Sequence, residues 1–243
     1  MKNIISLLKH FLIENSRGYF YSRSSYSQEG EDMVLSRFLD VNKKGFYVEV
    51  GCHHPFRFSN TYYFYKKGWS GICVDPLPGT IEIFKRWRHL DIVEEIGISD
   101  KEGLLTYYMF NEPALNTFDE KIAYERDGLR KYKIISKINI PVITLGNLLK
   151  KHLPTANHEI DFLSIDVEGF DIAVLRSNDW KLFRPVVVVV ECLRNDLHSM
   201  IDDPVSKYMM ELEYVPYAKT GNSVIFVTAE KMALHHLSMV KSN

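Results

Sequence analysis

Acidic residues follow five apolar segments of the sequence, each of which is typical of a β-strand. They are Glu49, Asp75, Asp100, the pair Asp166 and Glu168, and Glu191. Acids seldom lie near a core unless they are paired or bind something. A carboxylate can accept hydrogen bonds from hydroxyl groups, hold a divalent cation or take up a proton. These acids are therefore the first candidates for a functional site.

Gly51 and Asp75 have the spacing of a nucleoside site, because Asp75 comes 24 residues after Gly51. In nucleoside-binding α/β folds, an acid about 20 residues beyond the glycine turn accepts from the ribose hydroxyls. The further glycines that let a backbone contact a pyrophosphate are missing, since Gly51 is followed by Cys52, His53, His54 and Pro55. The turn therefore predicts a nucleoside without a diphosphate, such as S-adenosylmethionine.

Two further groups are candidates for contacts with that cofactor. Asp100, next to Ser99, would accept a hydrogen bond from the exocyclic amine of the adenine. Ser59, Asn60 and Thr61 open a predicted helix, so their side chains and the helix amides would bind the polar tail of the cofactor.

Strands that alternate with helices would bring these residues together. The expected strands span residues 45–51, 70–76, 91–100, 104–110, 160–169 and 184–192, and residues 214–229 are expected to form a hairpin that turns at Gly221 and Asn222. Alternation predicts parallel strands with right-handed crossovers, and ligands of such sheets bind at the carboxyl ends of the strands. The run from Val186 to Val190 is typical of a central strand that is covered on both faces.

The expected domain spans residues 41–230, between an N-terminal helical extension (1–40) and a C-terminal tail (231–243). Residues 111–137 match no pattern, although a helix is expected around Phe118–Arg126. This stretch is rich in aromatic residues. We interpret it as an insert that forms a lid over the acceptor and determines which acceptor is bound.

Composition and charge argue against several classes of protein. A net charge of −1 over 243 residues argues against a nucleic-acid binder. The three cysteines include no C-x-x-C pair; Cys73 and Cys192 are predicted core residues, and a reducing, cytoplasmic compartment is expected. The apolar stripe in residues 1–15 is interrupted by Lys9 and His10 and is too short to span a membrane. We expect it to pack on the domain or on a second subunit, which would make a homo-oligomer.

Several motifs, in order from Ser27 to Glu191, resemble the FkbM family of S-adenosylmethionine-dependent methyltransferases. They are SQEGEDMVL, FYVEVGCHHPFRFSNTYYFYKKGWSGICVDP, ISD, LSIDVEGFDIAVLRSNDW and RPVVVVVE. The resemblance implies an α/β fold of the Rossmann-like class I methyltransferase type. Its mostly parallel, seven-stranded sheet ends in an antiparallel hairpin and has helices on both faces. On this resemblance we also assign Gln28, Glu49 and Asp166 to the cofactor site.

The resemblance also implies O-methylation, often of sugar hydroxyls. In metal-dependent small-molecule O-methyltransferases, acids at the strand ends of Asp166 and Glu191 hold a divalent ion. Oxygen ligands suit magnesium, manganese or calcium better than zinc. Glu168 would be a third ligand or the general base. The rival explanation is that Arg194 compensates Glu191.

His53 and His54 are further candidates for the base, because a histidine near its ordinary pKa suits proton removal. Adjacent side chains in an extended turn point apart, so only one of the two is expected in the site, with a slight preference for His54. Asp171 is expected only to cap the helix that follows it.

The favoured hypothesis is an O-methyltransferase that acts on a sugar hydroxyl of a glycan, a polysaccharide or a glycosylated metabolite. Three alternatives stay open: an O-methyltransferase of a non-sugar small molecule, a non-catalytic module that binds the cofactor, and a nicotinamide oxidoreductase. The missing glycines argue against the last of these.

Overall fold

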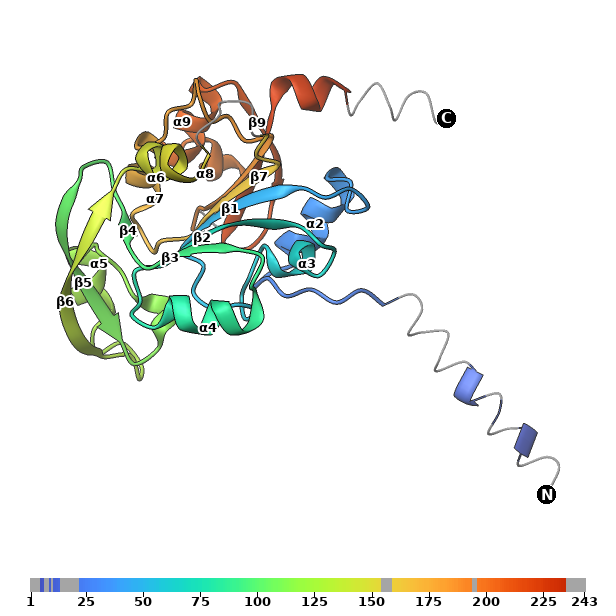
Figure 1. Cartoon of the computed structure of the whole chain (residues 1–243), viewed down its shortest axis with the longest axis horizontal. Coiled ribbons are helices and arrows are strands. Elements are labelled where there is room, and N and C mark those ends of the chain that lie inside the picture. Colours follow the sequence, from blue (N-terminus) through green and yellow to red (C-terminus); the bar gives the residue numbers. More distant parts are fainter. Residues whose placement is uncertain are drawn as a thin grey trace.

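The computed structural model describes residues 22–153, 159–193 and 196–234, together with residues 5, 6, 9 and 11–13. In this part of the chain seven strands form the main sheet, in the order β3-β2-β1-β7-β8-β10-β9 (Figure 1). They are β1 (Phe46–Val50), β2 (Ser70–Val74), β3 (Ile92–Glu94), β7 (Phe162–Ile165), β8 (Val187–Glu191), β9 (Tyr214–Lys219) and β10 (Ser223–Thr228).

The pairing of these strands confirms the predicted fold class. β1 pairs in parallel with β2 and β7, β7 with β8, and β2 with β3, whereas β10 is antiparallel to both β8 and β9. The carboxyl ends of β1, β2, β7 and β8 therefore lie at one edge of the sheet, which is where the candidate acids stand.

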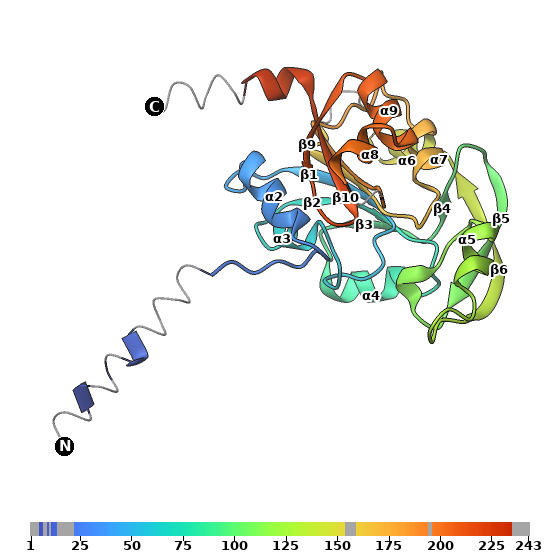
Figure 2. The ribbon, with the colours of Figure 1, turned by 180° about the vertical axis from the view of Figure 1, so that it is seen from behind.

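Helices cover both faces of the main sheet (Figures 1 and 2). One face carries α2 (Glu31–Phe38), α3 (Tyr62–Tyr65) and α4 (Thr80–Trp87); the other carries α6 (Leu145–His152), α7 (Asp171–Arg176), α8 (Leu197–Ile201) and α9 (Pro204–Glu211). Along β8, Val187 and Val189 pack in the core on the face that carries α2, α3 and α4. Val188 and Val190 pack in the core on the opposite face. The valine run is thus a central strand buried on both faces, as the sequence predicts.

A second, three-stranded sheet stands beside the main one (Figure 1). Its order is β4 (Gly97–Ile98), β6 (Ile134–Ile143) and β5 (Gly103–Phe110), and η1 (Pro113–Leu115) and α5 (Glu120–Arg126) connect β5 to β6. Tyr108, Phe110 and Ala123 form a small core of their own. We call residues 97–143 the appended unit.

The appended unit corrects two expectations. Residues 91–100 were expected to form one strand, but the chain leaves the main sheet after β3 and enters the second sheet at β4. Between them, the Glu95 carboxylate accepts from the amides of Gly79 and Ile81 at the start of α4. The expected insert, residues 111–137, is only part of this unit. The predicted helix in it is α5, which the Asp119 side chain caps by accepting from the amide of Ile122 at 2.9 Å.

The two ends of the domain also differ from their expected limits. Leu35 of α2 and Leu39 are buried in the core, so this part of the expected extension (1–40) packs on the main sheet. Residues 229–234 are helical and Met232 packs on the same core, although a tail was expected from residue 231. The expected N-terminal helix and its role in a homo-oligomer lie largely outside the described residues.

The described residues contain no helix that is long and apolar enough to cross a bilayer. Cys73 and Cys192 are buried, which confirms them as core residues, and Cys52 is buried as well. The cytoplasmic location stays a prediction.

Candidate functional site

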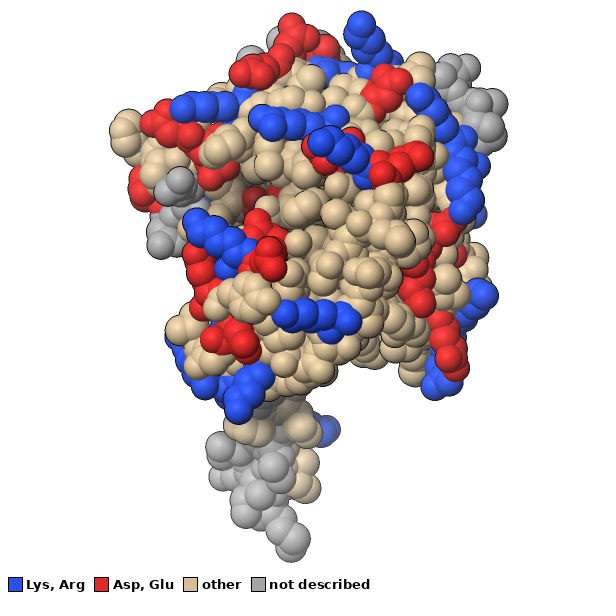
Figure 3. All heavy atoms as spheres, turned by 90° about the vertical axis from the view of Figure 1, so that its left-hand side faces the viewer, with Lys and Arg blue, Asp and Glu red and all other residues tan. Residues whose placement is uncertain are grey.

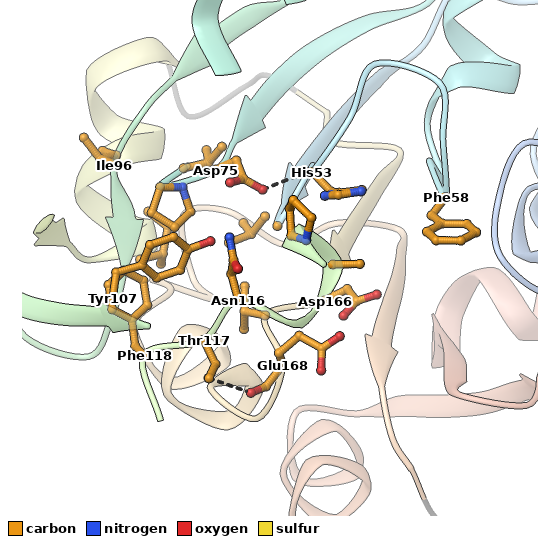
Figure 4. A pocket seen from close by; sticks show the side chains of 18 of the residues that line it. His53, Phe58, Asp75, Ile96, Tyr107, Asn116, Thr117, Phe118, Asp166 and Glu168 are labelled. Carbon is orange, nitrogen blue, oxygen red and sulfur yellow. Dashed lines mark hydrogen bonds between the residues drawn. The ribbon is translucent and has the colours of Figure 1, made fainter. Parts of the chain in front are cut away.

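A cavity opens at the carboxyl edge of the main sheet, between this sheet and the appended unit. Its empty space, with the open solvent at its mouth included, amounts to about 730 Å³. Gly51 and His53 after β1, Asp75 after β2, and Asp166 and Glu168 after β7 form one side of it (Figure 4). The structure therefore brings together residues that the sequence analysis selected separately.

Asp75 is held by the backbone in a way that suits a diol. One carboxylate oxygen accepts from the amide of His53 at 2.7 Å, and the other accepts from the amide of Leu77 at 2.9 Å. Each oxygen keeps acceptor capacity for one hydroxyl group of a ligand. Burial raises the pKa of Asp75, and the two amides partly offset this rise because they favour the ionised form.

Gly51 is required by the approach of two strand ends. Its φ of +84° lies in the left-handed region, and a Cβ atom there would lie 1.8 Å from the carbonyl oxygen of Asp166. The single glycine of the turn thus lets the segments after β1 and β7 meet beneath the cavity.

Glu49 and the Ser59–Thr61 segment lie behind this turn, and they are not among the residues that line the cavity. The Glu49 carboxylate accepts from the Thr61 hydroxyl at 2.6 Å and from the amide of Asn60 at 3.2 Å. The Asn60 side chain donates to the Ser164 hydroxyl of β7 at 2.9 Å. These residues therefore fix the path of the loop that carries His53.

Arg88, which sequence reasoning missed, is the centre of the same network and is fully buried. Its Nε atom pairs with Asp91 at 2.7 Å, and one terminal nitrogen lies 3.7 Å from Glu49. The guanidinium also donates to the Thr61 hydroxyl at 2.8 Å and to the carbonyl of Pro55 at 3.3 Å. One cation thus connects α4, β1 and the loop at residues 53–61. Its position after α4 carries no sequence signal.

Arg88→Met should lower the free energy of unfolding by about 3–5 kcal/mol, because it leaves Glu49 and Asp91 buried without a cation. Urea denaturation measures this loss. The matched control is Arg86→Met on the exposed side of α4, which should change the free energy by less than about 0.5 kcal/mol. Equal effects of the two substitutions would show that the buried network does not stabilise the domain.

Three acids that the sequence analysis assigned to a metal come together. Asp166, Glu168 and Glu191 each offer a carboxylate oxygen, and these oxygens lie within 4.8 Å of one another. We call these residues the acid triad. Space-filling spheres show acidic side chains around a recess in the face of the molecule that carries the appended unit (Figure 3).

Burial and the neighbouring carboxylates raise pKa values within the acid triad. Burial, together with the charges of Asp166 and Glu168, raises the pKa of Glu191 to about 10. Burial also raises the pKa of Asp166 well above its usual range, although solvent reaches this residue from the cavity, and the nearby Glu168 adds to the rise. The expected compensation by Arg194 lies outside the described residues.

The loop that carries Asp166 and Glu168 is fixed from two sides. Asp171 at the start of α7 accepts from the amides of Val167 and Gly169, so it shapes the loop and does not only cap the helix. From the appended unit, Arg126 pairs with the Glu168 carboxylate at 2.5 Å and the Thr117 hydroxyl donates to the Glu168 carbonyl at 2.9 Å. Burial raises the pKa of Glu168, and the charge of Arg126 opposes that rise.

Of the two histidines, His53 and not His54 lines the cavity, which reverses the slight preference for His54. The His54 ring accepts from the amides of Phe56 and Arg57 and so stabilises the turn. Nε2 of His53 lies 3.2 Å from the Arg57 guanidinium, which can only donate, so this nitrogen is the acceptor. Burial, followed by the charge of Arg57, lowers the pKa of His53 to about 4. His53 is therefore neutral near pH 7, but its basic nitrogen is already engaged.

The remaining predicted cofactor residues are divided between the cavity and its surroundings. Gln28 lines the cavity, on a loop that Asp32 holds by accepting from the Ser25 and Ser27 hydroxyls at 2.6 and 2.9 Å. Ser99 is buried and Asp100 is exposed, and neither is among the lining residues, although their neighbour Ile98 is.

The appended unit supplies the opposite side of the cavity, and sequence reasoning missed most of it. Tyr107, Asn116, Thr117 and Phe118 line this side. The aromatic content of the region was noticed, but it was interpreted as a lid for the acceptor. The appended unit reaches the cavity that holds Asp75 because β5 pairs with β6, and no local sequence pattern predicts this pairing.

The comparisons with known proteins indicate a family for this chain. A family profile described as "Methyltransferase FkbM domain" matches residues 49–214. A comparison with curated proteins finds no match. Among solved structures, Burkholderia thailandensis 1,6-didemethyltoxoflavin-N1-methyltransferase, with bound 1,6-didemethyltoxoflavin and S-adenosylhomocysteine, is similar at 11% identity. The match covers 93% of this chain and 88% of that one, with a TM-score of 0.38.

Proposed function

The chain belongs to the FkbM family of S-adenosylmethionine-dependent methyltransferases, and from this membership we propose that it methylates a hydroxyl group of a carbohydrate. The acceptor would be a sugar of a glycan, a polysaccharide or a glycosylated metabolite. The observation that carries the proposal is that Asp75 lines the same cavity as Asp166 and Glu168, the two members of the acid triad next to which Glu191 lies. One end suits a nucleoside, and the other offers groups that activate an alcohol.

The cavity fits S-adenosylmethionine, which supplies an electrophilic methyl group on a sulfonium. Asp75 presents two backbone-held carboxylate oxygens to the ribose hydroxyls. The turn at Gly51 leaves no backbone cradle for a diphosphate. The clustered carboxylates of Asp166 and Glu168 also suit a positively charged ligand.

The acid triad fits a divalent cation such as magnesium, manganese or calcium. Its ligand atoms are carboxylate oxygens, which these hard ions prefer. A bound cation would lower the pKa of the acceptor hydroxyl and orient its oxygen. Asp166 and Glu191 would hold the ion, and Glu168 would be a third ligand or the base.

In the proposed reaction, the acceptor oxygen forms a bond to the methyl carbon while the bond between that carbon and sulfur breaks. The hydroxyl proton passes to a carboxylate, for which Glu168 is the best placed, because it lines the cavity beside Asp166. The products are a methyl ether, S-adenosylhomocysteine and a proton that Glu168 later releases to water. His53 is a weaker candidate, since Arg57 occupies its acceptor nitrogen.

A transfer assay tests this proposal. Methyl-labelled S-adenosylmethionine is offered with a panel of free sugars, nucleotide sugars and glycans, and with a matched panel of phenols, non-sugar alcohols and amines. We expect label on a sugar oxygen, and loss of transfer in chelator. Label only on phenols or non-sugar alcohols would replace the acceptor class, and label on nitrogen would contradict O-methylation. Cofactor binding without transfer to any acceptor would support the non-catalytic alternative.

A further inference from the structure

Two polar side chains of the appended unit face the cavity and have no role in the mechanism above. Tyr107 lies on β5 and Asn116 follows η1. They are 4% and 7% exposed, so they lie deep in the cavity wall and not at its mouth. Both lie across the cavity from Asp75 (Figure 4).

The orientation of the Asn116 amide is fixed by the backbone. Its oxygen accepts from the amide of Phe110 at 2.7 Å, and an oxygen that accepts there leaves the nitrogen on the other side. This nitrogen points toward the cavity, next to the Tyr107 hydroxyl (Figure 4). The Asn116 amide nitrogen can only donate, and the Tyr107 hydroxyl can donate as well as accept, so both can donate to a ligand in the cavity. The wall therefore presents donors, opposite an acid that can only accept.

The place of these donors along the cavity indicates which part of a ligand they meet. Tyr107 lies on the side of the cavity away from Asp166 and Glu168 (Figure 4). The pair thus lies toward the end of the cavity that suits a nucleoside, away from the acid triad. Thr117, the next residue, is the one that contacts the Glu168 segment.

We propose that Tyr107 and Asn116 are the second half of the ribose site, donating hydrogen bonds to the ribose oxygens whose protons Asp75 accepts. The proposal rests on the assignment of the cavity to S-adenosylmethionine. A ribose hydroxyl is both a donor and an acceptor, so an acid on one side and neutral donors on the other satisfy it fully. The appended unit would then contribute to cofactor affinity as well as to acceptor choice.

Titration calorimetry with S-adenosylhomocysteine tests this assignment. Tyr107→Phe and Asn116→Ala should each weaken binding about 3- to 10-fold, as expected for one neutral hydrogen bond. Asn116→Asp keeps the oxygen that accepts from Phe110 but replaces the donor by an acceptor, so it should weaken binding more than Asn116→Ala. The controls are Tyr108→Phe, whose hydroxyl donates to Glu120 at 2.9 Å, and the exposed Asn111→Ala. Both should bind within twofold of the wild type.

Analogues of S-adenosylhomocysteine that lack the 2′- or the 3′-hydroxyl identify the contact. For the analogue that lacks the contacted oxygen, Tyr107→Phe and Asn116→Asp should cause little further loss, because the hydrogen bond is already missing. Melting temperatures of the variants show whether each is folded. Tyr107→Phe keeps the ring and remains a test if a substitution at Asn116 prevents folding.

Unchanged affinity for S-adenosylhomocysteine, with a raised KM for the acceptor, would overturn the inference and assign the pair to the acceptor. An equal loss for all analogues would overturn it as well. Asp75→Asn separates this failure from a wrong cavity assignment. If Asp75→Asn leaves affinity unchanged, the cavity is not the cofactor site; if it weakens binding while the wall variants do not, only the role of the wall is wrong.

Discussion

Asp166→Ala and Glu191→Ala are each expected to lower methyl transfer by more than about 100-fold, while affinity for S-adenosylhomocysteine stays within about threefold. A factor of 100 corresponds to about 2.7 kcal/mol of transition-state stabilisation, which is modest for loss of a ligand to a catalytic metal. Both acids belong to the acid triad, whose oxygens lie within 4.8 Å of one another and whose pKa values are raised. Like charges at this separation call for a cation or for protons.

The control for these substitutions is Asp179→Ala. Asp179 lies beyond α7 and pairs with Lys150, outside the cavity, so its removal should leave transfer unchanged. Exhaustive chelation of the wild type should reproduce the loss, and added magnesium, manganese or calcium should restore transfer. Full activity of a preparation that contains no metal would rule out a metal mechanism. Proton removal would then depend on Glu168 or His53 as a simple base.

Asp75→Ala should abolish cofactor binding or weaken it at least tenfold in a protein that stays folded. Hydrogen bonds to an ionised carboxylate contribute about 1.5–3 kcal/mol each, and Asp75 is placed to make one with each ribose hydroxyl. Calorimetry with S-adenosylhomocysteine measures the change. Asp75→Asn is the more conservative variant, since it keeps one oxygen but replaces the other by an NH2 group, which donates and so cannot pair with the backbone amide that donates at that position.

An exposed acid is the control for Asp75. Glu82→Ala on α4 removes a carboxylate of similar charge from the surface, so cofactor affinity should not change. A similar loss in both variants would point to a general effect of charge. Unchanged affinity of Asp75→Ala would mean that the spacing from Gly51 to Asp75 misidentifies the ribose site.

The fold was predictable because its signals are local. Short segments such as the valine run of β8, the glycine turn at Gly51 and the hairpin around Gly221 each have a pattern of their own. The parallel topology follows from the alternation of strands with helices along the chain. The acid triad was predictable for the same reason. Residues at the ends of neighbouring parallel strands must meet at one edge of the sheet, so Asp166 and Glu191 could be paired before their distance was known.

Other parts of the site depend on contacts between distant segments. The position of Arg88 after α4 carries no sequence signal, because its partners Glu49, Thr61 and Asp91 come from other segments. Asn116 enters the cavity only because β5 and β6 pair antiparallel and fold the appended unit back toward Asp75. That His53 and not His54 lines the cavity was unpredictable for a similar reason, since it depends on which ring the loop turns inward.

A crystal structure of the chain with S-adenosylhomocysteine is the most direct test of the central claim, that this cavity is the cofactor site of a methyltransferase. We expect both ribose hydroxyls on the Asp75 carboxylate, with the homocysteine sulfur toward the acid triad. A nucleoside bound elsewhere on the domain, or bound here with its ribose away from Asp75, would contradict it.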